Sequence, residues 1–78
     1  MNNEQSHVFF VNAVPYRTGQ PTMSGAEIKW ISNMVSTYQL YEESEDVETF
    51  GVPISDGTAI DFRINNVRHF FAIPPATW

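Results

Sequence analysis

Bulky apolar residues are concentrated in two segments near opposite ends of the chain, residues 7–14 and residues 68–73. Phenylalanine, valine and isoleucine favour the pleated, half-buried surface of a β-strand. Successive side chains of a strand point to opposite faces, so one residue of Phe9 and Phe10, and one of Phe70 and Phe71, must face each side. The pattern therefore predicts two strands that carry aromatic side chains on both faces of a sheet.

A helix start is the clearest local signal between these segments. Ser24 and Glu27 have the spacing of a capping box, in which each side chain accepts a hydrogen bond from the other residue's backbone N–H. Apolar residues then recur at helical spacing, which predicts a helix over residues 25–36 with one apolar stripe. The stripe comprises Ile28, Ile31 and Val35, with Met34 and Trp30 beside it and Trp30 flanking the core.

Shorter β-prone segments account for most of the remaining chain. Pro15 interrupts the first strand because it lacks a backbone N–H, and residues 16–21 hold turn residues and a possible short second strand. Strands are also expected in residues 37–41, 49–54 and 59–64, with tight turns at residues 55–57 and 65–66.

This order of two strands, one helix and several short strands predicts an α+β protein of the ubiquitin-like β-grasp class. We expect a mixed sheet of four to five strands packed on a single helix. The helix is the crossover, which leaves the first and last strands as parallel neighbours at the centre of the sheet. The domain is expected to span residues 7–73, between a flexible N-terminal tail (1–6) and an extended C-terminal tail (74–78).

Such a sheet has one face covered by the helix and one open face. The aromatic residues expected on the open face are Phe10, Tyr38 and either Phe70 or Phe71. Contiguous exposed aromatic side chains are typical of a partner-binding surface. The alternative is that residues 42–59 fold over these side chains and bury them.

Size and charge exclude several classes of protein. The 78 residues suffice for one domain, and the absence of cysteine excludes disulfides and thiolate metal sites. The net charge of −5 with four cationic residues argues against nucleic-acid binding. Residues 42–48 hold five of the nine acids but lack the alternating spacing of a calcium loop, so we expect a solvated loop and no metal site. No apolar run approaches the ~20 residues of a membrane span, and residues 1–6 lack signal-peptide character, so a cytoplasmic location is expected.

No catalytic motif is present. His7 and His69 could be drawn into a triad with Asp61 or Ser55, but there is no nucleophile elbow, phosphate loop or metal-binding histidine pair. Both histidines are interpreted as structural residues. A domain of this size has little room for a core and a substrate cavity, so we expect a non-enzyme without a cofactor.

Four segments in order resemble a bacterial ubiquitin-like domain of the multiubiquitin type. They are residues 9–12 (FFVN), 14–16 (VPY), 22–28 (TMSGAEI) and 70–76 (FFAIPPA). The resemblance covers most of the chain, from about His7 to Ala76. It implies a protein modifier of a bacterial ubiquitination-like pathway, whose C-terminal carboxylate is activated by an E1-like adenylating enzyme that consumes ATP. The implied partners are that enzyme, an E2-like enzyme, a processing or deconjugating peptidase and target proteins, in operons linked to antiviral defence.

The C-terminal tail departs from that family pattern. Ubiquitin-like modifiers end in two glycines, which allow a slim chain to enter an enzyme channel. Here the residues implicated in activation or processing are Pro74, Pro75, Ala76, Thr77 and Trp78. Three alternatives remain open: trimming after Ala76, partner enzymes that accept a bulkier tail, or a non-conjugated protein-interaction module that binds through its open sheet face.

Self-conjugation has few acceptors in this sequence. Lys29 is the only lysine, so an amide bond between copies would use Lys29 or the α-amino group of Met1. The simpler interpretation is that Lys29 is an ordinary exposed helix residue beside the apolar stripe.

Overall fold

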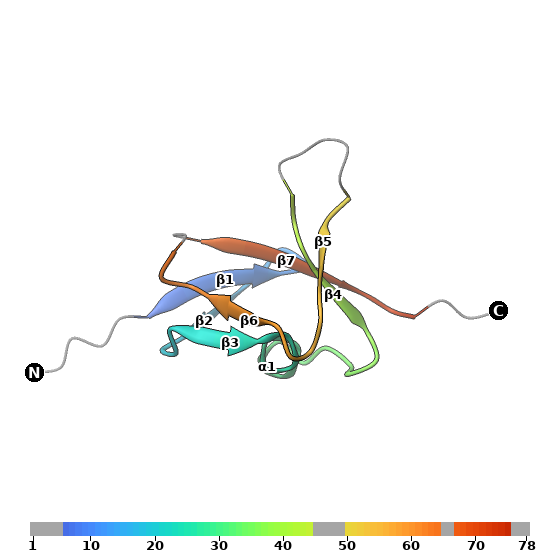
Figure 1. Ribbon diagram of the computed structural model, residues 1–78, viewed down its shortest axis with the longest axis horizontal. Helices are drawn as coiled ribbons and strands as arrows, with labels where there is room; N and C mark the ends of the chain where they lie inside the picture. Colours follow the sequence, from blue (N-terminus) through green and yellow to red (C-terminus); the bar gives the residue numbers. More distant parts are fainter. Residues whose placement is uncertain (1–5, 45–49, 65–66, 76–78) are drawn as a thin grey trace, which may run out of the picture.

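The computed structural model describes residues 6–44, 50–64 and 67–75. Within these ranges one helix packs on a mixed five-stranded sheet, and a second sheet has two strands (Figure 1). The elements in chain order are β1 (His7–Val11), β2 (Val14–Thr18), β3 (Thr22–Ser24), α1 (Gly25–Ile31), β4 (Gln39–Glu42), β5 (Val52–Ile54), β6 (Ala59–Asp61) and β7 (Arg68–Ile73).

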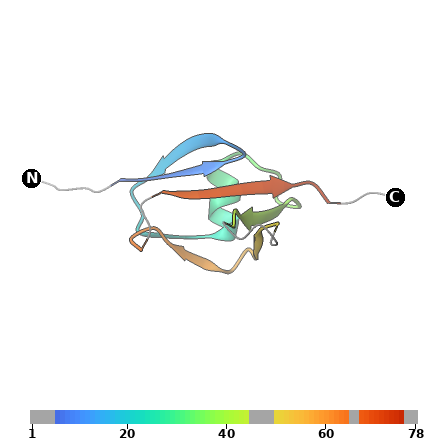
Figure 2. The ribbon, with the colours of Figure 1, turned by 90° about the horizontal axis from the view of Figure 1, so that it is seen from above.

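The larger sheet has the strand order β2-β1-β7-β4-β5. β1 and β7 are parallel, with Phe10 opposite His69, and the other neighbours are antiparallel. The prediction that the first and last strands are parallel neighbours inside the sheet is confirmed, and Figure 2 shows them side by side above α1. The smaller sheet pairs β3 with β6, where Met23 lies opposite Ile60.

The first hairpin turns earlier than the sequence predicted. Asn12 and Ala13 have φ values of 54° and 68°, and they join β1 directly to β2. Two consecutive left-handed residues give the backbone twist that a tight hairpin needs. Pro15 therefore lies within β2 and does not end the strand. β2 is an edge strand, where a missing N–H need not cost the sheet a hydrogen bond.

The helix starts as predicted and ends earlier. The capping box between Ser24 and Glu27 is present in both directions, at 2.9 and 3.1 Å. The predicted end at residue 36 is wrong because Asn33 adopts a left-handed φ of 61°. The Asn33 N–H donates to the Trp30 carbonyl and the Met34 N–H to the Lys29 carbonyl, which is a Schellman termination.

This early stop changes the environment of two residues assigned to the apolar stripe. Trp30 is 80% exposed and Val35 is 56% exposed, so neither flanks the core as predicted. Ile28 is fully buried, and Ile31 and Met34 pack against the core from its edge.

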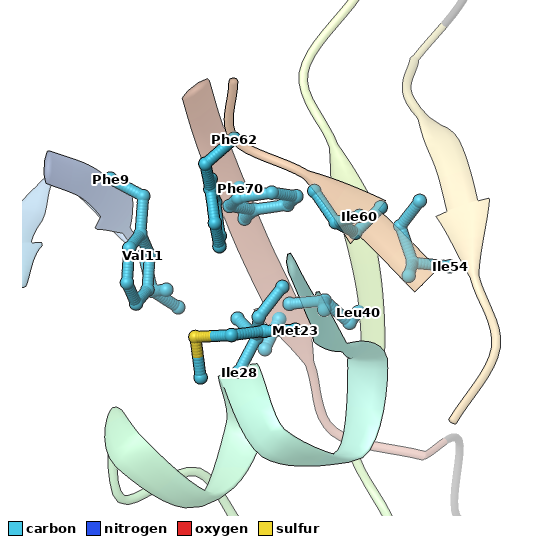
Figure 3. Close-up of a cluster of buried hydrophobic side chains, with 10 residues drawn as sticks. Phe9, Val11, Met23, Ile28, Leu40, Ile54, Ile60, Phe62 and Phe70 are labelled. Atoms are coloured by element: carbon cyan, nitrogen blue, oxygen red, sulfur yellow. The ribbon is translucent and has the colours of Figure 1, made fainter. Parts of the chain in front are cut away.

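The core lies between the inner face of the larger sheet, α1 and the smaller sheet (Figure 3). The Phe9 ring stacks on Phe62 at 5.3 Å and meets Phe70 edge-on at 6.2 Å. The fully buried or nearly buried apolar residues are Phe9, Val11, Met23, Ile28, Leu40, Ile54, Ile60, Phe62, Phe70 and Ala72.

The remaining strands occupy shorter ranges than their sequence patterns suggested. Residues 37 and 38 belong to the turn before β4, in which the Tyr38 N–H donates to the Val35 carbonyl at 2.9 Å. The predicted turn after β5 is confirmed by a 3.1 Å bond from the Thr58 N–H to the Ser55 carbonyl. The predicted turn at residues 65–66 lies outside the described residues.

Candidate functional site

The face of the larger sheet opposite α1 carries a group of aromatic side chains. Phe9 and Phe70 are fully buried, whereas their neighbours Phe10 and Phe71 are half-buried and lie on the other side of the sheet. The prediction that one residue of each pair faces away from the helix is therefore confirmed. We call Phe10, Tyr41, Phe50, His69 and Phe71 the aromatic face.

The strand register pairs these rings across neighbouring strands. Phe10 lies opposite His69, and their rings stack at 4.7 Å with an interplanar angle of 8°. Tyr41 lies opposite Phe71, and their rings stack at 5.1 Å and 8°. Phe50 meets both Phe71 and Tyr41 at steep angles, with centroid distances of 5.0 and 5.6 Å. The aromatic face is therefore an ordered arrangement of two stacked pairs and one additional ring.

Two of the residues predicted for this face are placed elsewhere. Phe70 is 0% exposed and belongs to the core. Tyr38 packs against the core and not on the aromatic face, since it belongs to the turn before β4 and not to the strand. Tyr41 takes the outward position instead. Once Leu40 is placed inward, strict alternation would have identified Tyr41.

Part of the segment expected to cover the open face does contact it. Phe50 is 72% exposed although it touches Tyr41 and Phe71. In Figure 1 the β4–β5 hairpin rises on the side of the sheet away from α1. Residues 45–49 of this segment lie outside the described residues, so the described part covers one end of the aromatic face and leaves Phe10 and His69 beyond it.

A shallow hollow of about 350 Å³ lies at this end of the face, lined by Glu43, Ser44, Phe50 and Phe71. Glu43 follows β4, and its N–H donates to the His69 carbonyl at 2.9 Å, which fixes its backbone beside β7. Gly51 permits the ring arrangement, since a Cβ there would meet the Phe71 ring at 2.8 Å. The hollow therefore combines aromatic walls with a carboxylate at its border.

Lys29 is not the exposed helix residue that its sequence position suggested. It is 5% exposed, and its Nζ donates to the carbonyls of Ser36 and Tyr38 at 2.8 and 2.9 Å. The same atom lies 2.8 Å from Asp56 Oδ1. The early end of α1 turns residues 36–38 back toward the amine. Conjugation at Lys29, the candidate self-acceptor, would require these contacts to break.

Two further ion pairs stabilise the fold. Arg68 donates two hydrogen bonds of 2.8 Å to Glu42, and these bonds raise the pKa of its guanidinium. Asp61 accepts from the Arg63 side chain and backbone, which lowers the pKa of its carboxyl from 3.8 to about 2. The Arg68–Glu42 pair joins β7 to β4, whereas the Arg63–Asp61 pair is local to the end of β6, and neither pair belongs to the aromatic face.

The two histidines lie on opposite sides of the sheet. The His7 ring stacks on the buried Phe62 at 6.1 Å, whereas His69 stacks on Phe10 on the aromatic face. Ser55 shares a 2.6 Å hydrogen bond with Thr58, and Asp61 is paired with Arg63. These residues therefore do not form the triad that could be drawn from the sequence. Among the described residues, no group of three or more possible metal ligands is found.

The C-terminal strand continues to Ile73 and is followed by the exposed Pro74 and Pro75. Figure 1 shows β7 running out of the sheet at the end opposite to the start of β1. Ala76, Thr77 and Trp78 lie outside the described residues.

No family model, curated protein or solved structure matches the chain. In the described part of the chain, no helix has the length and apolar character needed to cross a membrane.

Proposed function

We propose that the chain is a ubiquitin-like protein modifier with a β-grasp fold. The observation that carries the proposal is the strand order β2-β1-β7-β4-β5, with one helix on one face and the parallel β1–β7 pair inside the sheet. In this arrangement the last strand is anchored on both sides by β1 and β4, and the following residues leave the sheet at Pro74. This arrangement supports the proposal, because an activating enzyme binds the folded body of its substrate and reacts with a segment outside the sheet.

The proposed chemistry takes place on partner enzymes. The C-terminal carboxylate of the mature protein attacks the α-phosphate of ATP on an E1-like enzyme and releases pyrophosphate. A partner cysteine thiol then displaces AMP to give a thioester, which passes to an E2-like enzyme and finally to a nucleophile on a target. A peptidase trims the end beforehand or removes the modifier afterwards. Residues 74–78 enter the channels of these enzymes.

Incubation with the cognate E1-like enzyme, ATP and magnesium tests this proposal. Intact-mass spectrometry should detect a covalent adduct of the two proteins that disappears without ATP. A variant that lacks residues 74–78 should form no adduct, while the matched variant Arg63→Ala, altered far from the tail, should react normally. Equal adduct formation by the truncated variant would overturn the proposal.

The aromatic face supports a second candidate, a protein-interaction module that is not conjugated. Exposed, ordered aromatic side chains favour partner binding, and truncation of a well-packed aromatic contact typically costs about 2 kcal/mol or more. In this case Phe10→Ala should abolish binding to the partner whereas deletion of residues 74–78 should not. Mass spectrometry of the protein from its native cells distinguishes the two candidates, because only a modifier is found attached to other proteins.

A further inference from the structure

The hollow lined by Glu43, Ser44, Phe50 and Phe71 includes an exposed ring that the buried core does not need. Phe50 is 72% exposed and presents ring surface to solvent, although it contributes nothing to the buried core. Its ring stands at 69° to that of Phe71, so the two side chains form a corner. Aromatic ring faces carry partial negative charge and attract cations placed above them.

Glu43 adds a full negative charge at the border of this corner. Its side chain forms no hydrogen bond or ion pair with the residues that the structure describes. Each of the other carboxylates in the described part of the chain has a partner. The pairs are Glu27 with the Ser24 N–H, Glu42 with Arg68, Asp56 with Lys29 and Asp61 with Arg63. Glu43 is therefore available to a ligand.

We propose that this corner binds an arginine or lysine side chain on the surface of a partner protein. The aliphatic stem of the basic side chain lies against the two phenylalanine rings, and its charged head reaches the Glu43 carboxylate. The net charge of −5 attracts a basic partner over a longer distance. The proposal rests on the aromatic face being a binding surface, and it does not depend on activation of the C-terminal tail.

Nuclear magnetic resonance titration tests the pocket without knowledge of the partner. The ¹⁵N-labelled protein is titrated at constant ionic strength with N-acetyl-arginine amide and, separately, with N-acetyl-citrulline amide, which has nearly the same shape but no charge. Arginine should shift the backbone amides of Glu43, Gly51 and Phe71, and citrulline should shift them much less. The variants Glu43→Gln and Phe50→Leu should each weaken arginine binding about two- to fivefold.

Trp30→Ala is the matched control, because Trp30 is an exposed aromatic residue of α1 that lies outside the aromatic face, so its loss should leave arginine binding unchanged. Equal responses to arginine and citrulline, or unchanged binding by Glu43→Gln, would overturn the proposed pocket. The variant Glu43→Gln also separates a failure of the proposed pocket from a failure of the proposed function. Glu43→Gln should still form the E1 adduct, whereas failure of the modifier proposal would appear as absence of the adduct in the unaltered protein.

Discussion

Lys29 combines a charge with nearly complete burial, and its contacts explain how the chain tolerates this. Its ammonium joins the helix to two backbone carbonyls and to Asp56. We predict that Lys29→Met, which keeps the aliphatic stem, lowers the free energy of unfolding by about 1–3 kcal/mol because these acceptors lose their donor. Urea denaturation measures the loss.

Arg63→Met is the matched control for Lys29→Met. Arg63 also pairs with an aspartate, but its side chain is 63% exposed and solvent screens the pair, so the change should lower stability much less than Lys29→Met. If the two variants lost equal amounts of unfolding free energy, the burial of the Lys29 amine would not strengthen its contacts.

Asp61 gives the stability a pH dependence of known sign. Hydrogen bonds from Arg63 hold the pKa of its carboxyl at about 2, below the ordinary value of 3.8. A lowered acid pKa stabilises the folded state above the unfolded value, and this contribution is lost as the pH falls from about 3.8 toward 2. Asp61→Asn should therefore flatten the decline of the urea midpoint in that pH interval. A midpoint profile identical to that of the unaltered protein would contradict the prediction.

At the scale of elements, the first hairpin depends on a residue that fits its conformation poorly. Ala13 has a φ of 68°, a region that costs an L-residue about 1–2 kcal/mol. Asn12 fits better, and its Oδ1 also accepts from the Ala72 N–H at 3.1 Å, which ties the turn to β7. We predict that Ala13→Gly raises the free energy of unfolding by up to about 1 kcal/mol, measured by urea denaturation.

Ala59→Gly provides the comparison, since Ala59 is an exposed strand residue without a positive φ. Glycine there should lower stability by about 0.5–1 kcal/mol. If Ala13→Gly and Ala59→Gly lowered stability to the same extent, the left-handed conformation of Ala13 would not be a source of strain in the hairpin.

The helix and hairpin also show which element boundaries the sequence could predict. The capping box is a local side-chain pattern, so Ser24 and Glu27 located the helix start correctly. The helix end depends on Asn33 adopting a left-handed backbone within an apparently continuous apolar stripe, and residue spacing carries no signal for that. The hairpin was missed for a similar reason: Asn12–Ala13 lacks the glycine that usually identifies such a turn.

For the whole molecule, alternation predicted the two-sided character of the sheet but not the full aromatic face. Phe10 and Phe71 follow from strand periodicity and the parallel pairing of the end strands. Phe50 reaches the face through a contact between distant segments, and no local pattern encodes it. The burial of Lys29 is likewise a tertiary effect, because its partners come from the segment after the helix and from the turn after β5.

The two faces of β7 allow a direct comparison between adjacent residues of one type. Phe70 is fully buried in the core, whereas Phe71 stacks on Tyr41 on the aromatic face. Phe70→Ala should lower the free energy of unfolding by about 3–5 kcal/mol, most of the stability of a small domain. Phe71→Ala should cost about 1 kcal/mol, since it loses ring contacts without leaving a core cavity.

Urea denaturation followed by circular dichroism measures both changes. Phe71→Ala should also abolish the arginine-induced amide shifts while the protein stays folded, a combination that a purely structural role of Phe71 would not give. A loss of stability as large as that of Phe70→Ala would instead show that the aromatic face is a second core, covered in solution by the β4–β5 hairpin. The surface would then be closed to partners, because its rings would already be covered by other residues of the chain.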